Sequence, residues 1–265
     1  MKVLKHSSLI SLLPEVLSNS VENGIRTQLP ELYAVLFPLA VPLRKPGPIN
    51  FGVVLFPTFE ALDVFGPLES LNLLSFSHPM NLSLIAATLD PVSTKPHSAA
   101  MNPYNSSFGE SILPTHTFGT VGPLDVLLVP GGLGTRAADL NATISFISRT
   151  YPTLDYLIAV CTGVGIVART GILDGRRATT NKKAWAQTTA LGPRVNWIAH
   201  ARWVTDGNIW TSSGVSAGMD VILAWIESIY GNATATDIAN GMEYERHLNA
   251  SWDPFADLYN LTRAA

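Results

Sequence analysis

The chain contains one cysteine, Cys161, at a point where a strand is expected to lead into a helix. Cys161 directly follows the apolar run 156–160 (YLIAV) and directly precedes 162–165 (TGVG), where small side chains allow close packing of helix and strand. A residue at such a turn projects from the sheet, and the helix N-terminus should lower the pKa of its thiol. These features predict a nucleophilic thiolate; the alternative interpretation is an inert core cysteine.

Asp63 supplies a carboxyl that is expected at the same edge of the sheet, in the segment 57–67 (PTFEALDVFGP) that follows the first predicted strand. Its neighbours Leu62 and Val64 should partly remove it from water, which raises the pKa of a carboxyl and suits proton transfer. The alternative is a structural role, in which Asp63 organises the turn before a helix that opens at Pro67.

Gly131 and Gly132 follow Pro130 at the end of the apolar run 125–129 (DVLLV). Positions without side chains let backbone N–H groups approach a ligand and face a developing negative charge. We therefore predict an oxyanion-binding role, although most Pro-Gly-Gly triplets are ordinary turns.

Apolar runs and helical segments that should position these residues alternate along the chain. Strands are expected at 51–56, 82–87, 125–129 and 156–160, with a hairpin at 201–210 around Asp206-Gly207. Helices are expected to open at Pro67, to follow Cys161 as far as Arg169, and to cover 139–149, 215–230 and 232–248. This alternation predicts an α/β domain over 51–265, with a mainly parallel sheet and helices on both faces. Residues 1–50 are interpreted as an N-terminal extension, either poorly ordered or a targeting segment.

The amino-acid composition argues against several classes of protein. In 265 residues, 17 Lys and Arg against 20 Asp and Glu give a net charge of −3, so a broad basic surface for nucleic acid is not expected. One cysteine excludes an internal disulfide and a cysteine-based zinc site, and we predict no metal or cofactor. No uninterrupted apolar run is long enough to span a membrane.

The compartment is left open by two opposing signals. The apolar stretch near the N-terminus is interrupted by Pro14 and Glu15, unlike a clean signal peptide. Six Asn-X-Ser/Thr triplets nevertheless favour N-glycosylation and a secretory route. Their asparagines are Asn81, Asn105, Asn141, Asn232, Asn249 and Asn260.

Four motifs together resemble the ThiJ/PfpI superfamily, which is related to class I glutamine amidotransferases, and within it the isonitrile (isocyanide) hydratase branch. They are FPTFEALDVFGPLE, LDVLLVPGG, YLIAVCTGVGIVARTGILDGRRATT and DGNIWTSSGVSAGMD, and the match extends over about 51–230. The resemblance implies a flavodoxin-like fold with a nucleophile elbow, and a homodimer. It places the nucleophile at Cys161, its acid partner at Asp63, a residue that bonds near the thiol at Thr162, and backbone donors at Gly131 and Gly132.

One position departs from many relatives, which carry histidine where this chain has Asn181. A Cys–His pair built from that position is therefore absent, and amidotransferase or peptidase chemistry becomes doubtful. Isonitrile hydration does not need that base if Asp63 transfers the proton. His116, His200 and His247 are interpreted as surface or packing residues.

The favoured function is a cysteine-dependent hydratase or lyase that converts an isonitrile to an N-substituted formamide through a covalent thioimidate. The expected partner is a small-molecule substrate, with no nucleic acid and no membrane. Alternatives are glyoxalase-like processing of 2-oxoaldehydes, or a redox-sensing or binding protein without turnover. A transcription regulator is a weak hypothesis, because we find neither a DNA-binding domain pattern nor a basic surface signal.

Overall fold

The computed structural model describes residues 47–261, with residue 97 omitted. The predicted extension over 1–50 therefore lies almost wholly outside the described residues, and only its last four residues are included. Within the described part, no helix is both long and apolar enough to cross a bilayer.

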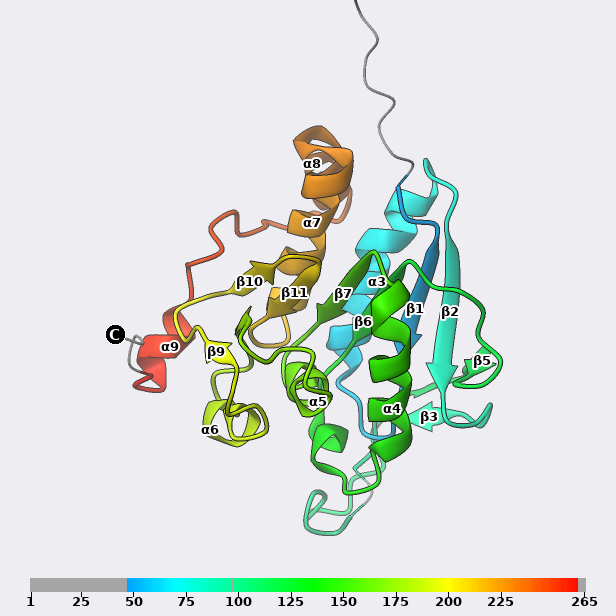
Figure 1. Ribbon diagram of the computed structural model, residues 1–265, viewed down its shortest axis with the longest axis vertical. Helices are drawn as coiled ribbons and strands as arrows, with labels where there is room; N and C mark the ends of the chain where they lie inside the picture. Colours follow the sequence, from blue (N-terminus) through cyan, green and yellow to red (C-terminus); the bar gives the residue numbers. More distant parts are fainter. Residues whose placement is uncertain (1–46, 97, 262–265) are drawn as a thin grey trace, which may run out of the picture. The chain divides into compact units, whose positions relative to one another are not determined.

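A seven-stranded sheet forms the centre of residues 47–261 (Figure 1). In order across the sheet, its strands are β10 (Trp203–Asp206), β11 (Ile209–Ser212), β7 (Tyr156–Ala159), β6 (Val126–Val129), β1 (Asn50–Val54), β2 (Asn81–Ala86) and β5 (His116–Thr117). All neighbouring strands are parallel except the hairpin pair β10 and β11. The order β2-β1-β6-β7-β11 is that of a flavodoxin-like sheet, in which ligands bind beyond the carboxyl ends of the strands.

Helices cover both faces of this sheet, as the sequence predicts. The α-helices of the described residues are α3 (Ala61–Ser75), α4 (Asn141–Thr150), α5 (Gly163–Arg169), α6 (Trp185–Thr189), α7 (Ala217–Tyr230), α8 (Asn232–Gly241) and α9 (Pro254–Leu258). Helices α3, α7 and α8 pack together on one face, and α4 and α5 lie on the other (Figure 1). The central strands are buried on both sides, which explains their continuous apolar sequences.

Smaller elements connect these layers. They are the paired strands β3 (Val92–Ser93) and β4 (Ser111–Ile112), the paired strands β8 (Arg177–Ala178) and β9 (Asn196–Trp197), and the 3₁₀ turns η3 (Leu133–Arg136) and η4 (Tyr151–Thr153). Turn η3 follows the Gly131-Gly132 segment directly.

Helix α3 begins six residues earlier than predicted, at Ala61, so Pro67 lies inside it. Proline lacks the N–H that would bond the carbonyl one turn earlier, a cost normally avoided in helix interiors. Burial of apolar side chains such as Leu71 and Leu74 offsets that loss, whereas the sequence alone favours proline as a first helical residue. The correction places Asp63 in the first turn of a helix, not in a loop.

The helix predicted over 232–248 is also too long, because α8 ends at Gly241. The chain beyond it turns toward Asp220, a buried carboxylate on α7. Asp220 accepts hydrogen bonds from the Tyr244 hydroxyl (3.1 Å) and the His247 backbone N–H (2.9 Å). These long-range contacts hold 242–253 in a non-helical path that leads to α9.

The sequence of helix α7 is apolar over most of its circumference, which favours burial by more than one neighbour and is compatible with the expected homodimer. Within the chain, α7 already packs against α3, α8 and the strands β10 and β11. Its largest side chain, Trp225, is fully buried there. The apolar circumference is therefore explained without a second copy, and the homodimer stays a prediction.

The asparagines of the six predicted glycosylation triplets share one property: each is exposed to solvent. Exposure is required for attachment of a glycan. Glycosylation therefore stays a prediction that the fold permits.

Candidate active site

Cys161 occupies the turn between β7 and α5 in a left-handed backbone conformation, with φ of 56°. This region is sparsely populated by residues with a side chain, and such strain persists only where the surroundings hold it. Here the Cys161 N–H donates to the Ser212 carbonyl (3.3 Å), and the Cys161 carbonyl accepts from Thr180 Oγ1 (2.7 Å). A side chain at Gly163 would collide with the Pro130 carbonyl, which explains the small residue after the turn. The predicted elbow is present.

Asp63 is fully buried (0% exposed) beside the elbow, in the first turn of α3. Its Oδ2 accepts a hydrogen bond from the Gly131 N–H (2.8 Å), whereas Oδ1 is a buried oxygen without a hydrogen-bond partner of normal geometry. Burial raises the pKa of Asp63 to about 7 and the Glu60 charge adds to this, although the Gly131 hydrogen bond and the neighbouring Cys161 thiol lower it in part. Because Asp63 lies inside the first turn of α3, whose N-cap is Glu60, the alternative in which it organises a turn before a helix that opens at Pro67 is wrong.

The Cys161 sulfur lies among polar groups, although the residue is only 4% exposed. Asn181 Nδ2 donates to Sγ (3.2 Å), while Asn181 Oδ1 accepts from the Ala184 N–H (3.0 Å). The Ala184 contact fixes the orientation of the amide, so the NH₂ group must face the sulfur. Asn181, the position where many relatives carry histidine, is thus a contact of the thiol that sequence reasoning missed.

The pKa of the Cys161 thiol is raised, contrary to the prediction of a stabilised thiolate. Burial is the largest cause and the nearby Asp63 charge is the second, while hydrogen bonds from the Thr162 backbone and Asn181 lower it only in part. The contribution of a helix N-terminus is about 0.3–1 kcal/mol at exposed sites. Burial shifts pKa values by up to about 3–5 units, each worth about 1.4 kcal/mol, so desolvation outweighs the helix. The resting group is a thiol beside a carboxyl of intermediate pKa.

The backbone donors predicted at Gly131 and Gly132 reach the site, but both are already paired. The Gly131 N–H donates to Asp63, and the Gly132 N–H donates to Thr162 Oγ1 (3.0 Å). The Thr162 hydroxyl donates in turn to the Gly132 carbonyl (3.2 Å). Structurally, these glycines hold Asp63 and Thr162 in position, and they are not vacant donors for an oxyanion.

Replacing Gly131 with alanine is expected to disturb this arrangement. The added Cβ would lie 2.7 Å from Thr162 N and Oγ1 and 2.8 Å from Asp63 Oδ2, closer than side chains pack. We expect the free energy of unfolding to fall by about 1–3 kcal/mol, as for other overpacked sites, and the site geometry to be lost. Urea denaturation measures the change, with Gly122→Ala as the control because a Cβ there meets open space. Equal stability of the two variants would contradict this packing.

Two hollows are lined by residues that neighbour the thiol. One, of about 560 Å³, is lined by Thr162, Arg136 and Arg169 among others. The other, of about 320 Å³, is lined by Asn181 and by Leu62, the neighbour of Asp63. Asn181 donates to the Cys161 sulfur and Thr162 is the next residue along the chain, so both hollows adjoin the thiol, although Cys161 itself lines neither.

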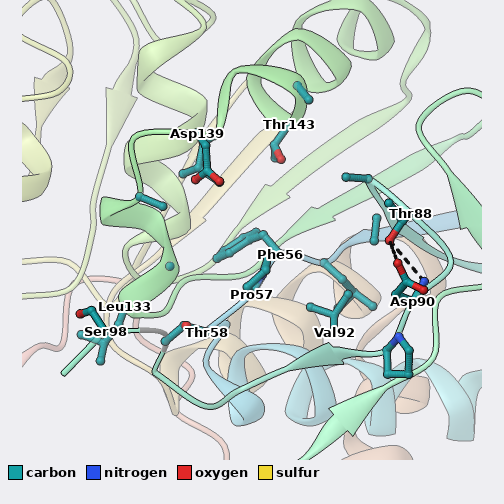
Figure 2. Close-up of a pocket in the computed structure, with 18 of the residues that line it drawn as sticks. Phe56, Pro57, Thr58, Thr88, Asp90, Val92, Ser98, Leu133, Asp139 and Thr143 are labelled. Carbon is teal, nitrogen blue, oxygen red and sulfur yellow. Dashed lines mark hydrogen bonds between the residues drawn. The ribbon is translucent and has the colours of Figure 1, made fainter. Parts of the chain in front are cut away.

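A larger cavity, of about 620 Å³, is mainly apolar (Figure 2). Phe56, Pro57, Val92 and Leu133 line it, but Cys161, Asp63 and Asn181 do not. We therefore do not assign the reaction to it.

The three histidines considered above, His116, His200 and His247, have partners or positions away from the sulfur. His200 Nε2 lies 2.7 Å from Asp257 Oδ1, and His247 Nδ1 lies 3.2 Å from Asp220 Oδ2. His116 belongs to β5, at the far edge of the sheet from β10. Among the described residues, no group of three or more His, Cys, Asp or Glu side chains is placed to hold a metal.

Comparisons with known proteins agree with this fold. The DJ-1/PfpI family matches residues 52–228. An isonitrile hydratase from Pseudomonas putida is 33% identical over 198 residues, which cover 74% of this chain and 78% of that enzyme. The transcriptional regulator GbdR from Pseudomonas aeruginosa is 30% identical over 54% of this chain, but over only 39% of that regulator. A crystal structure of a ThiJ/PfpI family protein from Pseudomonas syringae is 29% identical, with a TM-score of 0.63 and coverage of 80% of this chain and 85% of that one. The predicted resemblance is confirmed, and the chain belongs to the DJ-1/PfpI family.

Proposed function

We propose that this protein hydrates isonitriles to N-substituted formamides, with Cys161 as the nucleophile and Asp63 as the group that moves the proton. The observation that carries the proposal is the Asp63 carboxyl, buried beside the thiol with Oδ1 unpartnered and a pKa of about 7. Such a group can accept and return a proton near neutral pH. The 33% identity to an isonitrile hydratase supports the same activity.

In the first step, ionised Asp63 takes the thiol proton as the Cys161 sulfur bonds to the terminal carbon of the isonitrile. Asp63 then delivers that proton to the same carbon, so the product is a thioimidate, R–N=CH–S–Cys161. The N–H donors of Asn181 and Thr162 stabilise the charge that develops on sulfur during the transfer. Covalent catalysis here divides one difficult hydration into two easier steps.

In the second step, water adds to the thioimidate carbon, with Asp63 as the base that activates it. The resulting tetrahedral adduct is R–NH–CH(OH)–S–Cys161. Collapse breaks the C–S bond, returns a proton to sulfur and releases R–NH–CHO. The sum is one isonitrile and one water converted to one formamide, with no cofactor required.

Gly131, Gly132 and Thr162 take positioning roles in this scheme. The Gly131 N–H holds Asp63 Oδ2, which leaves Oδ1 for the thiol, and the Gly132–Thr162 pair holds the turn that carries the sulfur. A redox-sensing function fits less well, because easily oxidised cysteines are exposed and ionised, whereas this thiol is buried with a raised pKa.

The proposal is tested by incubating purified protein with phenyl isonitrile and methyl isonitrile and quantifying the formamides by chromatography. Methylglyoxal is assayed in parallel, because glyoxalase-like processing would use the same nucleophile. Formation of either formamide, dependent on protein concentration, is the expected result. Conversion of methylglyoxal with no conversion of any isonitrile would refute the proposed substrate class.

A further inference from the structure

The 320 Å³ hollow that Asn181 lines is also lined by Phe255 of helix α9 and by Tyr259, which directly follows this helix. Phe255 and Tyr259 both line the hollow, and they remain 45% and 41% exposed. Leu62, at 40% exposure, lines it as well and directly precedes Asp63. Large apolar side chains thus face open space next to the proposed reaction centre. The family match ends at residue 228, so these two aromatic residues lie outside the matched region.

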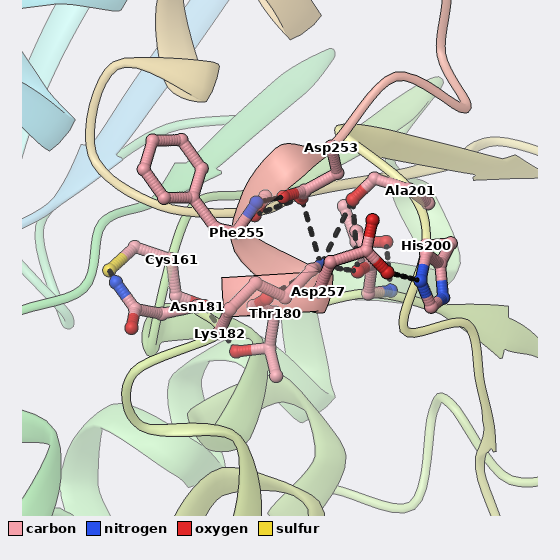
Figure 3. Close-up of polar contacts among 12 residues, drawn as sticks. Cys161, Thr180, Asn181, Lys182, His200, Ala201, Asp253, Phe255 and Asp257 are labelled. Atoms are coloured by element: carbon pink, nitrogen blue, oxygen red, sulfur yellow. Dashed lines mark hydrogen bonds and ion pairs between the residues drawn. The ribbon is translucent and has the colours of Figure 1, made fainter. Parts of the chain in front are cut away.

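Buried Asp253 fastens α9 to the segments that build the site (Figure 3). Its Oδ2 accepts from Ser213 Oγ (2.8 Å) and lies 3.3 Å from Lys182 Nζ, while its Oδ1 caps α9 at the Phe255 N–H (2.9 Å). The contact of His200 Nε2 with Asp257 Oδ1 (2.7 Å) adds a second attachment. Helix α9 is therefore a fixed part of this region.

The same short segment serves both the thiol and α9. Thr180 donates a hydrogen bond to the Cys161 carbonyl, and Asn181 donates one to the Cys161 sulfur. The next residue, Lys182, forms an ion pair with Asp253. Figure 3 shows these residues in succession, with the Phe255 ring extending from α9 on the Cys161 side of the network. The position of the aromatic rings is thereby tied to the position of the sulfur.

The charges that line this hollow are mostly neutralised. Lys182 is paired with Asp253, and Arg202 is paired with Asp220 (2.6 Å), both within buried surroundings. Lys183, which also lines the hollow, remains as an exposed cation. An anionic substituent therefore has few partners inside, whereas a flat apolar group can contact the two rings.

We propose that Phe255 and Tyr259 form an aromatic wall of the substrate site, which selects isonitriles that carry an aryl substituent. This inference rests on the proposed function and names its substrate class. At about 320 Å³, the hollow is at the small end of ligand sites and suits a single ring. The aryl group would stack against the wall while the isonitrile carbon points toward Cys161.

The test compares Phe255→Ala, Tyr259→Ala and the double variant with the wild-type protein. We expect each single change to lower the ratio of kcat/KM for phenyl over methyl isonitrile about tenfold, because lost apolar contacts reduce discrimination by such factors. Leu258→Ala is the matched control: Leu258 belongs to the same helix, is 66% exposed and does not line the hollow. An unchanged ratio in the double variant would overturn the aromatic wall and leave the hydratase function standing.

A binding measurement separates this inference from the proposed reaction. In a Cys161→Ala background, which removes turnover, calorimetry measures the affinity of the hollow for N-phenylformamide and for N-methylformamide. We expect Phe255→Ala and Tyr259→Ala to weaken binding of N-phenylformamide about tenfold and to leave N-methylformamide unchanged. If wild-type protein converts no isonitrile but this aryl preference is observed, the proposed function fails and the wall is retained. Equal binding of the two formamides in every variant would refute the wall.

Discussion

Replacing Cys161 with alanine is expected to reduce isonitrile hydration by at least about 10³-fold, because the second step has no thioimidate to act on without the sulfur. Serine at this position keeps a hydroxyl near Asp63 but is a much weaker nucleophile, so Cys161→Ser should also lose most activity. The measurement is the rate of formamide formation at saturating phenyl isonitrile. Activity of Cys161→Ala within tenfold of the wild type would contradict nucleophilic catalysis.

The covalent intermediate gives a second readout of the same prediction. Wild-type protein that is acid-quenched during turnover should show an added mass equal to one isonitrile, located on the peptide that contains Cys161. Because Cys161 is the only cysteine in the chain, no other thiol can carry this adduct. Unfolding of Cys161→Ala in urea provides the control, since an inactive but unfolded variant would not report on chemistry.

The sheet and the elbow were predictable because they depend on local pattern. Continuous apolar runs such as 126–129 and 156–159 are typical of parallel strands with both faces covered. The turn at Cys161 follows from a strand that stops immediately before a run of small residues. Helix α3 was misplaced because Pro67 is a strong local signal, and the burial that compensates for it comes from distant parts of the chain.

The electrostatic state of the site could not be read from the sequence. The short helix after Cys161 suggests a stabilised thiolate, but the degree of burial depends on the packing of α3, η3 and the 180–184 segment around the sulfur. The hydrogen bond from Asn181 joins residues twenty positions apart in the chain. From the sequence, position 181 was notable only because it carries asparagine where many relatives carry histidine. Nothing in the sequence indicated that the Asn181 amide donates to the sulfur. The sequence likewise did not predict that helix α9 lies beside the site, because this depends on the buried ion pair between Lys182 and Asp253.

Asp63→Asn is expected to produce opposite effects on activity and stability. The amide oxygen can still accept from the Gly131 N–H, so the local structure should survive. The amide cannot accept the thiol proton or return it to carbon, and loss of a general acid–base group costs about 10²–10⁴-fold in rate. Turnover of phenyl isonitrile at pH 7 measures this loss. Asp139→Asn makes the same chemical change at an exposed position that touches none of these groups, and should leave the rate unchanged.

The stability effect follows from the sign of the pKa shift. Because burial raises the pKa of Asp63 from 3.8 to about 7, the folded protein holds a proton between these pH values that the unfolded chain has released. The contribution of Asp63 to stability therefore falls as pH rises through this range, and the cost of burying the charge is complete above about pH 7. Asparagine does not titrate. From pH 5 to pH 8, the free energy of unfolding of Asp63→Asn should gain about 3 kcal/mol relative to the wild type.

Urea denaturation at both pH values measures that difference, and Asp139→Asn again serves as the control. A relative stability that is the same at pH 5 and pH 8 would mean that Asp63 does not carry a raised pKa. The wild-type kcat/KM should rise with pH through an apparent pKa near 7, which belongs to the Cys161–Asp63 pair as a unit. If Asp63→Asn gains stability at pH 8 while it loses turnover, the buried carboxyl is retained at the expense of stability, because the reaction needs a proton acceptor at that position.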